Sequence, residues 1–369
     1  MFGFAPLLWR LLGKIPPTSE RSHCSPNVIK LNFMVKVFSI DWFAANFLGT
    51  VENGGFFEFA PLGYGSRQFG LLHSVKWRGF DVGTVASCPT LPSLPKNFIQ
   101  FKMDNAWLYD SAFEYIVEDL MGMLGWKWHS LSRLDLAMDF HCFENGMMPQ
   151  DFIKRFMSGK YSLVSKAKFA VYGEADGKNS FESLTIGSRQ SPCRVYLYNK
   201  TKELEEVAYK SWIVNSWEKA GLDKSREVWR LEVSIKHDGM KLVEVDSGDV
   251  FGFEWKDVKD RFAMCKVYES LVSRYFRFIP YSESKNRYRE KPLELFGWTG
   301  LTLRRYRDVP KVKTNRTDKI FAAKLGKEMN VGCSVVSDFR MNAILWANDW
   351  IVAHGLEDYC EMRNCTPKV

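Results

Sequence analysis

One stretch of eleven residues, 132–142, constrains the fold of this chain more than any other; it reads Ser-Arg-Leu-Asp-Leu-Ala-Met-Asp-Phe-His-Cys. Its apolar residues fall at every second position, which is the alternation of a strand with one buried face. The opposite face carries Asp135 and Asp139, although aspartate is depleted in strands. Two interpretations stay open at this point. The carboxylates are solvated on an exposed strand, or they form an acidic surface that holds a divalent metal ion against a phosphate.

A second strand of the same kind is predicted over 228–235, with Glu232 on its polar face. Asp135 and Asp139 are separated along one strand by roughly 13 Å, at about 3.3 Å per residue, so a straight strand cannot bring both to one ion. A neighbouring strand lies only about 4.8 Å away. We therefore expect Asp135 and Glu232 to share a metal ion, with Asp139 as a more distant ligand or one that requires a β-bulge.

The surrounding sequence predicts short strands joined by tight turns, followed by longer helices. Further strands are predicted at 71–77, 80–86, 98–103, 161–172, 181–186 and 194–198, and helices at 111–124, 151–157, 201–219, 255–275, 317–329 and 337–354. A capping box formed by Ser111 and Glu114 is expected to begin the first of these helices. The predicted fold class is α+β: a mostly antiparallel central sheet with flanking helices, followed by a helical basic C-terminal lobe.

These patterns divide the chain into a poorly patterned extension at 1–33, a core at 34–238 and the helical lobe at 239–369. The formal net charge is +8, and eleven basic against four acidic residues between Lys285 and Lys319 place +7 in that segment. Aromatic residues lie among these cations, a composition suited to phosphate contacts and base stacking. A solvated linker is the alternative interpretation of the segment, because charge runs are commonly surface.

Several classes of protein are excluded by what the sequence lacks. The apolar opening stretch 1–15 is interrupted by Arg10 and Lys14 and is too short to span a bilayer, so no membrane partner is expected. The eight cysteines include no Cys-x-x-Cys pair, which predicts free thiols in a reducing, cytoplasmic compartment and no structural zinc site. There is no His-x-His pair, which a large class of tyrosine nickases uses to hold metal, and no phosphate loop of a helicase motor.

Residues between the two acidic strands have the chemistry to act on a phosphate. The turn that contains Arg189 offers backbone amides, a hydroxyl and a guanidinium to an oxyanion, although a plain hairpin turn is the alternative. The next strand places Tyr196 and Tyr198 on its polar face, and Lys200 follows. A tyrosine near a metal-bound phosphodiester can capture one DNA end as a phosphotyrosine. Its free pKa is about 10, so a metal ion or Lys200 would have to favour the phenolate; packing or stacking is the alternative role.

Four short motifs in series resemble the replication initiation factor family, which includes rolling-circle initiators of staphylococcal plasmids, replication proteins of some filamentous phages and relaxases of certain conjugative elements. The motifs are Arg133-Leu134-Asp135-Leu136-Ala137-Met138-Asp139, Thr185-Ile186-Gly187-Ser188-Arg189, Val195-Tyr196-Leu197-Tyr198-Asn199-Lys200 and Trp229-Arg230-Leu231-Glu232-Val233. Their order and approximate spacing agree with the family over about residues 38–236.

The resemblance implies a nickase that depends on Mg²⁺ or Mn²⁺, cuts one DNA strand at a replication origin and becomes joined to its 5′ end. It implies Tyr198 as the nucleophile and Asp135, Asp139 and Glu232 as the metal ligands. Arg189 and Lys200 would then stabilise the developing charge. Origin DNA, single-stranded or supercoiled, is the implied partner in a bacterial cytoplasm. A host helicase, a polymerase and a second copy of the chain are further candidate partners.

Two departures from the family keep alternatives open. Asn199 stands where an acidic residue is common after the tyrosine, and Tyr196 shares the strand face of Tyr198, so either tyrosine could be the nucleophile. No helix-turn-helix precedes the core, which leaves origin recognition to the basic lobe or to the sheet. The alternatives to a replication initiator are a conjugative relaxase with the same chemistry, a non-catalytic DNA-binding protein, and a nuclease that uses water.

Overall fold

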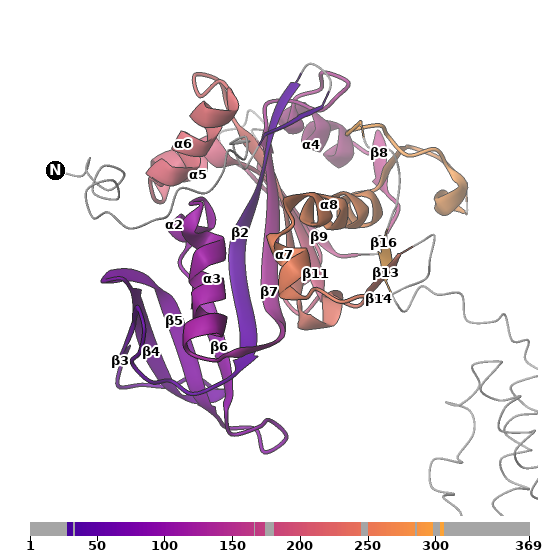
Figure 1. The fold of residues 1–369 in the computed structure, drawn as a ribbon. Coiled ribbons are helices and arrows are strands. Elements are labelled where there is room, and N and C mark those ends of the chain that lie inside the picture. Colours follow the sequence, from indigo (N-terminus) through magenta and orange to yellow (C-terminus); the bar gives the residue numbers. More distant parts are fainter. Residues whose placement is uncertain are drawn as a thin grey trace, which may run out of the picture.

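The computed structural model describes residues 28–31, 34–165, 167–173, 181–244, 250–284, 286–297 and 303–305. Its central feature is an antiparallel sheet, to which these residues contribute eleven strands in the order β3-β4-β5-β6-β2-β7-β12-β11-β10-β9, with β1 paired to β2 (Figure 1). The strands of this sheet are β1 (Val28–Leu31), β2 (Met34–Leu48), β3 (Phe57–Pro61), β4 (Phe69–Trp77), β5 (Phe80–Pro89), β6 (Phe98–Met103), β7 (Lys127–Phe140), β9 (Phe169–Gly173), β10 (Phe181–Ile186), β11 (Cys193–Asn199) and β12 (Trp229–Lys236).

Helices and two small sheets surround the central sheet. The helices are α2 (Asn105–Leu108), α3 (Ala112–Met123), α4 (Pro149–Met157), α5 (Lys200–Glu206), α6 (Ser211–Ala220), α7 (Trp255–Lys259) and α8 (Arg261–Tyr275), with 3-10 turns η1 (His237–Gly239) and η2 (Arg287–Arg289). The small sheets pair β8 (Tyr161–Leu163) with β15 (Phe278–Pro280), and β13 (Leu242–Glu244) with β14 (Val250–Phe251) and β16 (Leu303–Arg305). The predicted α+β fold, with a large antiparallel sheet and flanking helices, is confirmed. The helices predicted at 317–329 and 337–354 lie outside the described residues.

Some predicted elements are divided differently in the structure. The helix predicted over 255–275 is two helices, because Asp260 ends α7 and its carboxylate accepts hydrogen bonds from the first backbone amides of α8. The helical stretch 201–219 likewise holds α5 and α6, and the strand predicted over 161–172 separates into β8 and β9. The predicted capping box is wrong: the side chain of Ser111 makes no cap hydrogen bond, and Asp110 Oδ1 accepts from the Ala112 amide at 2.8 Å instead.

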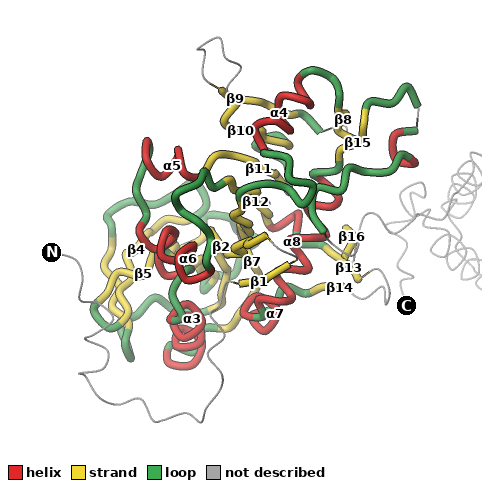
Figure 2. Tube along the Cα trace, turned by 90° about the horizontal axis from the view of Figure 1, so that it is seen from above, coloured by secondary structure: helices red, strands yellow, loops and turns green. Residues whose placement is uncertain are grey.

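The two faces of the sheet carry different layers. On the core face, the apolar residues of β2, β7, β11 and β12 pack with those of α3, α7 and α8 in one hydrophobic cluster. On the opposite face, a smaller cluster joins Val37 of β2 to α5 and α6 through Leu204, Ile213 and Trp217. Figure 2 shows α5 and α6 on the other side of the strands from α7 and α8. The second face is polar along β7, β11 and β12, and we call it the polar face.

The boundary predicted between a core and a C-terminal lobe stays a prediction. The helices α7 and α8 follow the predicted boundary at residue 238, yet their apolar residues lie in the same cluster as the sheet. Tyr268 of α8 also donates a buried hydrogen bond to the Leu231 carbonyl of β12 at 2.8 Å. Residues up to Tyr275 therefore support the sheet directly. Most of the basic segment 285–319 lies outside the described residues.

A β-bulge in β2 decides which of its residues reach the polar face. The register pairs Ile40 with Leu136 and Trp42 with Asp135, so Asp41 is an extra residue on β2. The buried positions shift accordingly from Phe38 and Ile40 to Phe43, Ala45 and Phe47. An extra residue of this kind bends the strand and re-aims its side chains. Both Asp41 and Trp42 are therefore available to the polar face.

Gly83 of β5 is expected to be required for the pairing of β5 with β6. Its φ is +149°, and an added Cβ would lie 2.1 Å from the backbone oxygen of Lys102. We predict that Gly83→Ala lowers the free energy of unfolding by about 2 kcal/mol or more. Gly122 of α3 is the matched control, because its Cβ would meet open space. Gly122→Ala should raise stability by about 0.5 kcal/mol. Urea denaturation measures both, and equal effects would contradict the close approach at Gly83.

Candidate functional site

The side chains of Tyr198, Glu232 and Lys200 meet on the polar face where β11 ends. The Tyr198 hydroxyl donates to Glu232 Oε2 at 2.9 Å, and Lys200 Nζ lies 3.5 Å from the same hydroxyl. Strand pairing accounts for this meeting, because β11 and β12 are antiparallel neighbours that pair Tyr196 with Glu232 and Tyr198 with Arg230. Tyr198 therefore contacts the carboxylate of Glu232, which lies two residues along β12 from Arg230, the residue that Tyr198 pairs with. The structure thus brings together three of the six predicted site residues.

The Tyr198-Asn199-Lys200 motif forms the junction between β11 and α5. Asn199 is buried and its side-chain oxygen accepts from the Lys202 amide at 3.1 Å, so it caps α5. An asparagine is among the preferred residues at this position. The departure from an acidic residue thus has a structural role here. Lys200 is the first residue of α5; it is 1% exposed and ion-paired with Glu203 at 2.5 Å.

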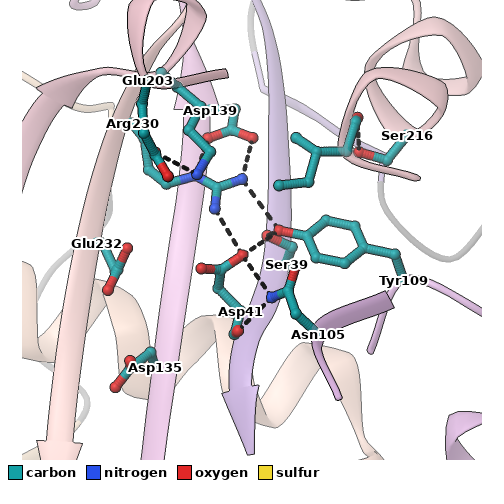
Figure 3. A network of polar contacts seen from close by, with 12 residues as sticks. Ser39, Asp41, Asn105, Tyr109, Asp135, Asp139, Glu203, Ser216, Arg230 and Glu232 are labelled. Carbon is teal, nitrogen blue, oxygen red and sulfur yellow. Dashed lines mark hydrogen bonds and ion pairs between the residues drawn. The ribbon is translucent and has the colours of Figure 1, made fainter. Parts of the chain in front are cut away.

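A buried arginine ties three strands together beside this junction. Arg230 is 0% exposed, and its guanidinium donates to both carboxylate oxygens of Asp139, at 2.6 and 2.7 Å. It also donates to Asp41 at 2.7 Å and to the Tyr109 hydroxyl at 3.1 Å. Trp217 of α6 donates to Asp139 at 2.7 Å from the other side. The network therefore spans β12, β7 and β2 (Figure 3), and Trp217 connects it to α6.

This network explains the position of Asp139. The carboxylate is 0% exposed, and Arg230 and Trp217 engage both of its oxygens. The structure does not place it with Asp135 and Glu232. Its predicted contribution to a metal site is untested, but its geometry favours the role of a buried counter-ion for Arg230.

Asp41 is a site residue that the sequence reasoning missed. Tyr109, Asn105 and Arg230 all donate to its Oδ1, at 2.6, 3.2 and 2.7 Å. Burial alone would raise the pKa of Asp41, but Arg230, Lys200 and the hydrogen bonds hold that pKa well below its ordinary value. The one available signal was an aspartate inside the apolar stretch 35–48, since aspartate is seldom buried without a partner.

Three carboxylates, those of Asp41, Asp135 and Glu232, lie on neighbouring strands of the polar face (Figure 3). Burial, and then the charges of Asp41 and Asp135, raise the pKa of Glu232 to about 8. Burial also raises the pKa of Asp135, although Arg133 opposes this by donating to both its oxygens, at 3.0 and 2.5 Å. Among the described residues, no cation forms a close pair with Glu232 as Arg230 does with Asp41, so Glu232 favours its neutral form.

The donor chemistry of this carboxylate cluster fits a divalent cation. Carboxylate oxygens are the ligands that Mg²⁺ and Mn²⁺ prefer, and clustered like charges are relieved by a cation. The arrangement is not a preformed cage: within the described ranges no three His, Cys, Asp or Glu side chains are grouped as a metal site. The Arg133 guanidinium already donates to both oxygens of Asp135, so a metal ion would have to compete with it for that carboxylate. The sequence prediction that Asp135 and Glu232 share an ion stays a prediction.

Tyr198 and Tyr196 are distinguished by their surroundings. Burial, and then the charge of Glu232, raise the pKa of Tyr198 well above its ordinary value, so its phenol stays protonated and donates to Glu232. Tyr196 is partly exposed, and the Arg194 guanidinium lies 4.7 Å from its ring centroid. Of the two, Tyr198 has both a carboxylate and an ammonium group at its hydroxyl. Which of the two tyrosines is the nucleophile stays a prediction.

Arg189 does not join the other predicted residues. It lies in the turn between β10 and β11, whereas Tyr198 lies near the opposite end of β11. Cys193 and Tyr198 alone are separated by roughly 17 Å at about 3.3 Å per residue. The structure therefore leaves Arg189 exposed and distant from the tyrosine hydroxyl.

Comparisons with known proteins identify no family for this chain. No protein-family model and no curated protein matches it. Among solved structures, it is similar to a rolling circle replication initiator protein from Geobacillus stearothermophilus, with 14% identity and a TM-score of 0.41. That match covers 70% of this chain and 93% of the other. A likeness this distant assigns neither a site nor a reaction. No helix in the described ranges is long and apolar enough to cross a membrane.

The raised pKa of Glu232 predicts a dependence of stability on pH. Because the folded pKa of about 8 exceeds the ordinary value of 4.5, the contribution of Glu232 to stability falls as pH rises through this window. The substitution Glu232→Gln removes the group whose ionisation causes this loss of stability. We expect the melting temperature of the variant, relative to the unsubstituted protein, to be at least about 2 °C higher near pH 9 than near pH 5. The exposed Glu205→Gln is the control, and a difference independent of pH would contradict the buried repulsion.

Substitution of Asp139 is expected mainly to lower stability, whereas substitution of Asp135 is expected mainly to remove the stabilising effect of a metal ion. Asp139→Asn leaves a buried guanidinium short of a counter-ion and should cost about 3 kcal/mol of unfolding free energy. Asp135→Asn should cost less, because the Arg133 side chain is 37% exposed and can return to water. Urea denaturation measures both. In thermal melts, added Mn²⁺ should stabilise the unsubstituted protein and Asp139→Asn but not Asp135→Asn; loss of the Mn²⁺ effect only in Asp139→Asn would make Asp139 the ligand.

Proposed function

We propose that this chain is a rolling-circle replication initiator, a metal-dependent nickase that cuts one DNA strand at an origin and religates it through a 5′-phosphotyrosine on Tyr198. The observation that carries the proposal is the contact of the Tyr198 hydroxyl with Glu232 and Lys200, beside the carboxylates of Asp41 and Asp135. The four motifs that resemble replication initiation factors contribute most of these residues. Asp41 adds a residue from outside the motifs.

The reaction is a transesterification at one phosphodiester. The Tyr198 oxygen attacks phosphorus, the bond from phosphorus to the 3′ oxygen breaks, and the 5′ phosphate becomes joined to the tyrosine. The phenol proton passes toward Glu232 Oε2, which already accepts it in a hydrogen bond. This transfer requires the ionised form of Glu232, which a bound divalent cation would favour. The departing 3′ oxygen takes up a proton and becomes the hydroxyl that primes synthesis. The number of phosphoester bonds is unchanged, so religation requires no ATP.

Lys200 is proposed to stabilise charge on the tyrosine oxygen and on the phosphate. Its ammonium is buried and lies 3.5 Å from the Tyr198 hydroxyl, where a fixed positive charge acts more strongly than in water. Its ion pair with Glu203 holds it in place. Arg189 is too far along the hairpin for contact with the same phosphate, so its proposed role is limited to DNA outside the scissile bond.

Asp135 and Glu232, with Asp41 beside them, are the residues proposed to hold Mg²⁺ or Mn²⁺. When bound, such an ion would polarise the scissile phosphate and neutralise the carboxylates that keep Tyr198 protonated. Arg230 and Tyr109 orient Asp41 through its Oδ1. DNA is the partner that the proposal requires; a helicase, a polymerase and a second copy of the chain stay predictions.

The test is incubation of the purified protein with supercoiled DNA of its own replicon and Mn²⁺, followed by denaturing electrophoresis. We expect a covalent protein–DNA adduct that is lost in Tyr198→Phe and reduced at least about 100-fold in Asp135→Ala. Tyr196→Phe, on the same strand and face, is the matched control and should keep the adduct.

Each other outcome identifies an alternative. An adduct that survives Tyr198→Phe but not Tyr196→Phe would move the nucleophile to Tyr196. Nicking without any adduct would indicate a nuclease that uses water. Binding that survives EDTA, with neither nicking nor adduct, would leave a non-catalytic DNA-binding protein.

A further inference from the structure

A row of three cations crosses the polar face next to the carboxylate cluster. It consists of Lys102 of β6, Arg133 of β7 and Lys236 of β12, which we call the cation row. The register supports the alignment, because Ala44 of β2 pairs with both Lys102 and Arg133, and Arg133 pairs with Lys236. Adjacent strands are about 4.8 Å apart, so the row extends across roughly 14 Å, perpendicular to the strands.

Trp42 lies beside this row and is the large aromatic side chain that the β-bulge moves to the polar face. It pairs with Asp135 in the register and is partly exposed. Lys102 Nζ is 4.2 Å from its ring centroid and Arg133 Cζ is 4.3 Å from it. Tryptophan flanked by cations is the combination that single-strand-binding grooves use, in which bases stack on the ring and phosphates meet the cations.

Two of the three cations have charge available for a phosphate. The Lys102 side chain makes no hydrogen bond or ion pair within the described part of the chain, although the Asp104 carboxylate lies near it. Lys236 is exposed, and its Nζ donates to the backbone oxygen of Arg189 at 2.5 Å, a neutral partner that leaves the ammonium charge uncompensated. Arg133 is already paired with Asp135. Lys102 and Lys236 are therefore the expected phosphate contacts, at the two ends of the row.

We propose that the cation row and Trp42 bind the single-stranded part of the DNA substrate. One base stacks on Trp42 by displacing Lys102 from the ring, and phosphates bind Lys102 and Lys236. This inference rests on the proposed function, and it names the residues that position the strand. Glu232 is four residues from Lys236 on β12, roughly 13 Å. The row would thus hold nucleotides a few positions from the phosphate that Tyr198 attacks.

The test is the binding of a labelled single-stranded oligonucleotide to the full chain, measured by fluorescence anisotropy in EDTA so that no cleavage occurs. We expect Trp42→Ala to weaken binding at least about fivefold and Trp42→Phe to weaken it less. Lys102→Ala and Lys236→Ala should each reduce the slope of log affinity against log salt by about 0.7. The control is Lys256→Ala in α7, a 73% exposed lysine on a helix of the core face.

The outcomes separate this inference from the proposed function. Affinities and salt slopes of Lys102→Ala and Lys236→Ala equal to those of Lys256→Ala would overturn the cation row, even if Trp42→Ala failed to fold. Equal binding of the duplex form, with the same losses, would overturn the single-strand assignment. If the row variants lose binding but the unsubstituted protein forms no adduct, the binding surface stands and the nickase fails. Adduct formation with unchanged binding in every row variant would support the nickase and overturn the cation row.

Discussion

The buried guanidinium of Arg230 is the interaction on which the arrangement of the site depends. A fully buried charge is tolerated only when it is paired and its hydrogen bonds are satisfied. Arg230 meets this condition with Asp139 on β7, Asp41 on β2 and Tyr109 after α2, while Trp217 of α6 completes the shell around Asp139. Three strands and two helices must therefore be in place before the charge is satisfied. The same contacts hold Asp41 at the edge of the carboxylate cluster.

As a consequence, the carboxylates on the polar face are neutralised to different extents. Asp139 and one oxygen of Asp41 are engaged by Arg230, and Asp135 is engaged by Arg133. Glu232 accepts a hydrogen bond from the neutral hydroxyl of Tyr198, and burial together with its acidic neighbours raises its pKa to about 8. A carboxyl group poised in this way next to a phenol is suited either to accept a proton or to bind a cation. The proposed chemistry at Tyr198 would use this carboxyl group in one of these two ways.

The polar face is divided between a covered and an accessible part. Where Val37, Asp139 and Arg230 lie, α6 packs on the strands and its apolar residues exclude water. Farther along the same strands, Trp42, Arg133 and Lys236 are partly or fully exposed. Glu232 lies between these parts, and Tyr198, which pairs with Arg230, reaches Glu232 with its hydroxyl. This division allows a buried anchor and an accessible binding surface to occupy one face of one sheet.

Alternation along β7 and β12 was enough to predict which residues face the core and that both strands carry acids on the other side. It also predicted that Asp135 lies closer to Glu232 than to Asp139. It also placed Tyr198 and Lys200 at the end of β11, because these are local properties of a period of two. The sequence did not reveal that Arg230 is the partner of Asp139, or that Arg189 is separated from Tyr198.

The sequence did not reveal the contribution of Asp41 to the site either. It reaches the polar face only through a bulge, which appears when β2 is paired with β7 and not before. The sequence by itself therefore determined the faces of β7, β11 and β12 and most residues of the site, but not Asp41. Only the tertiary structure decided which charges neutralise one another and which remain free, because that depends on strand neighbours, register and helix packing between residues far apart in the chain.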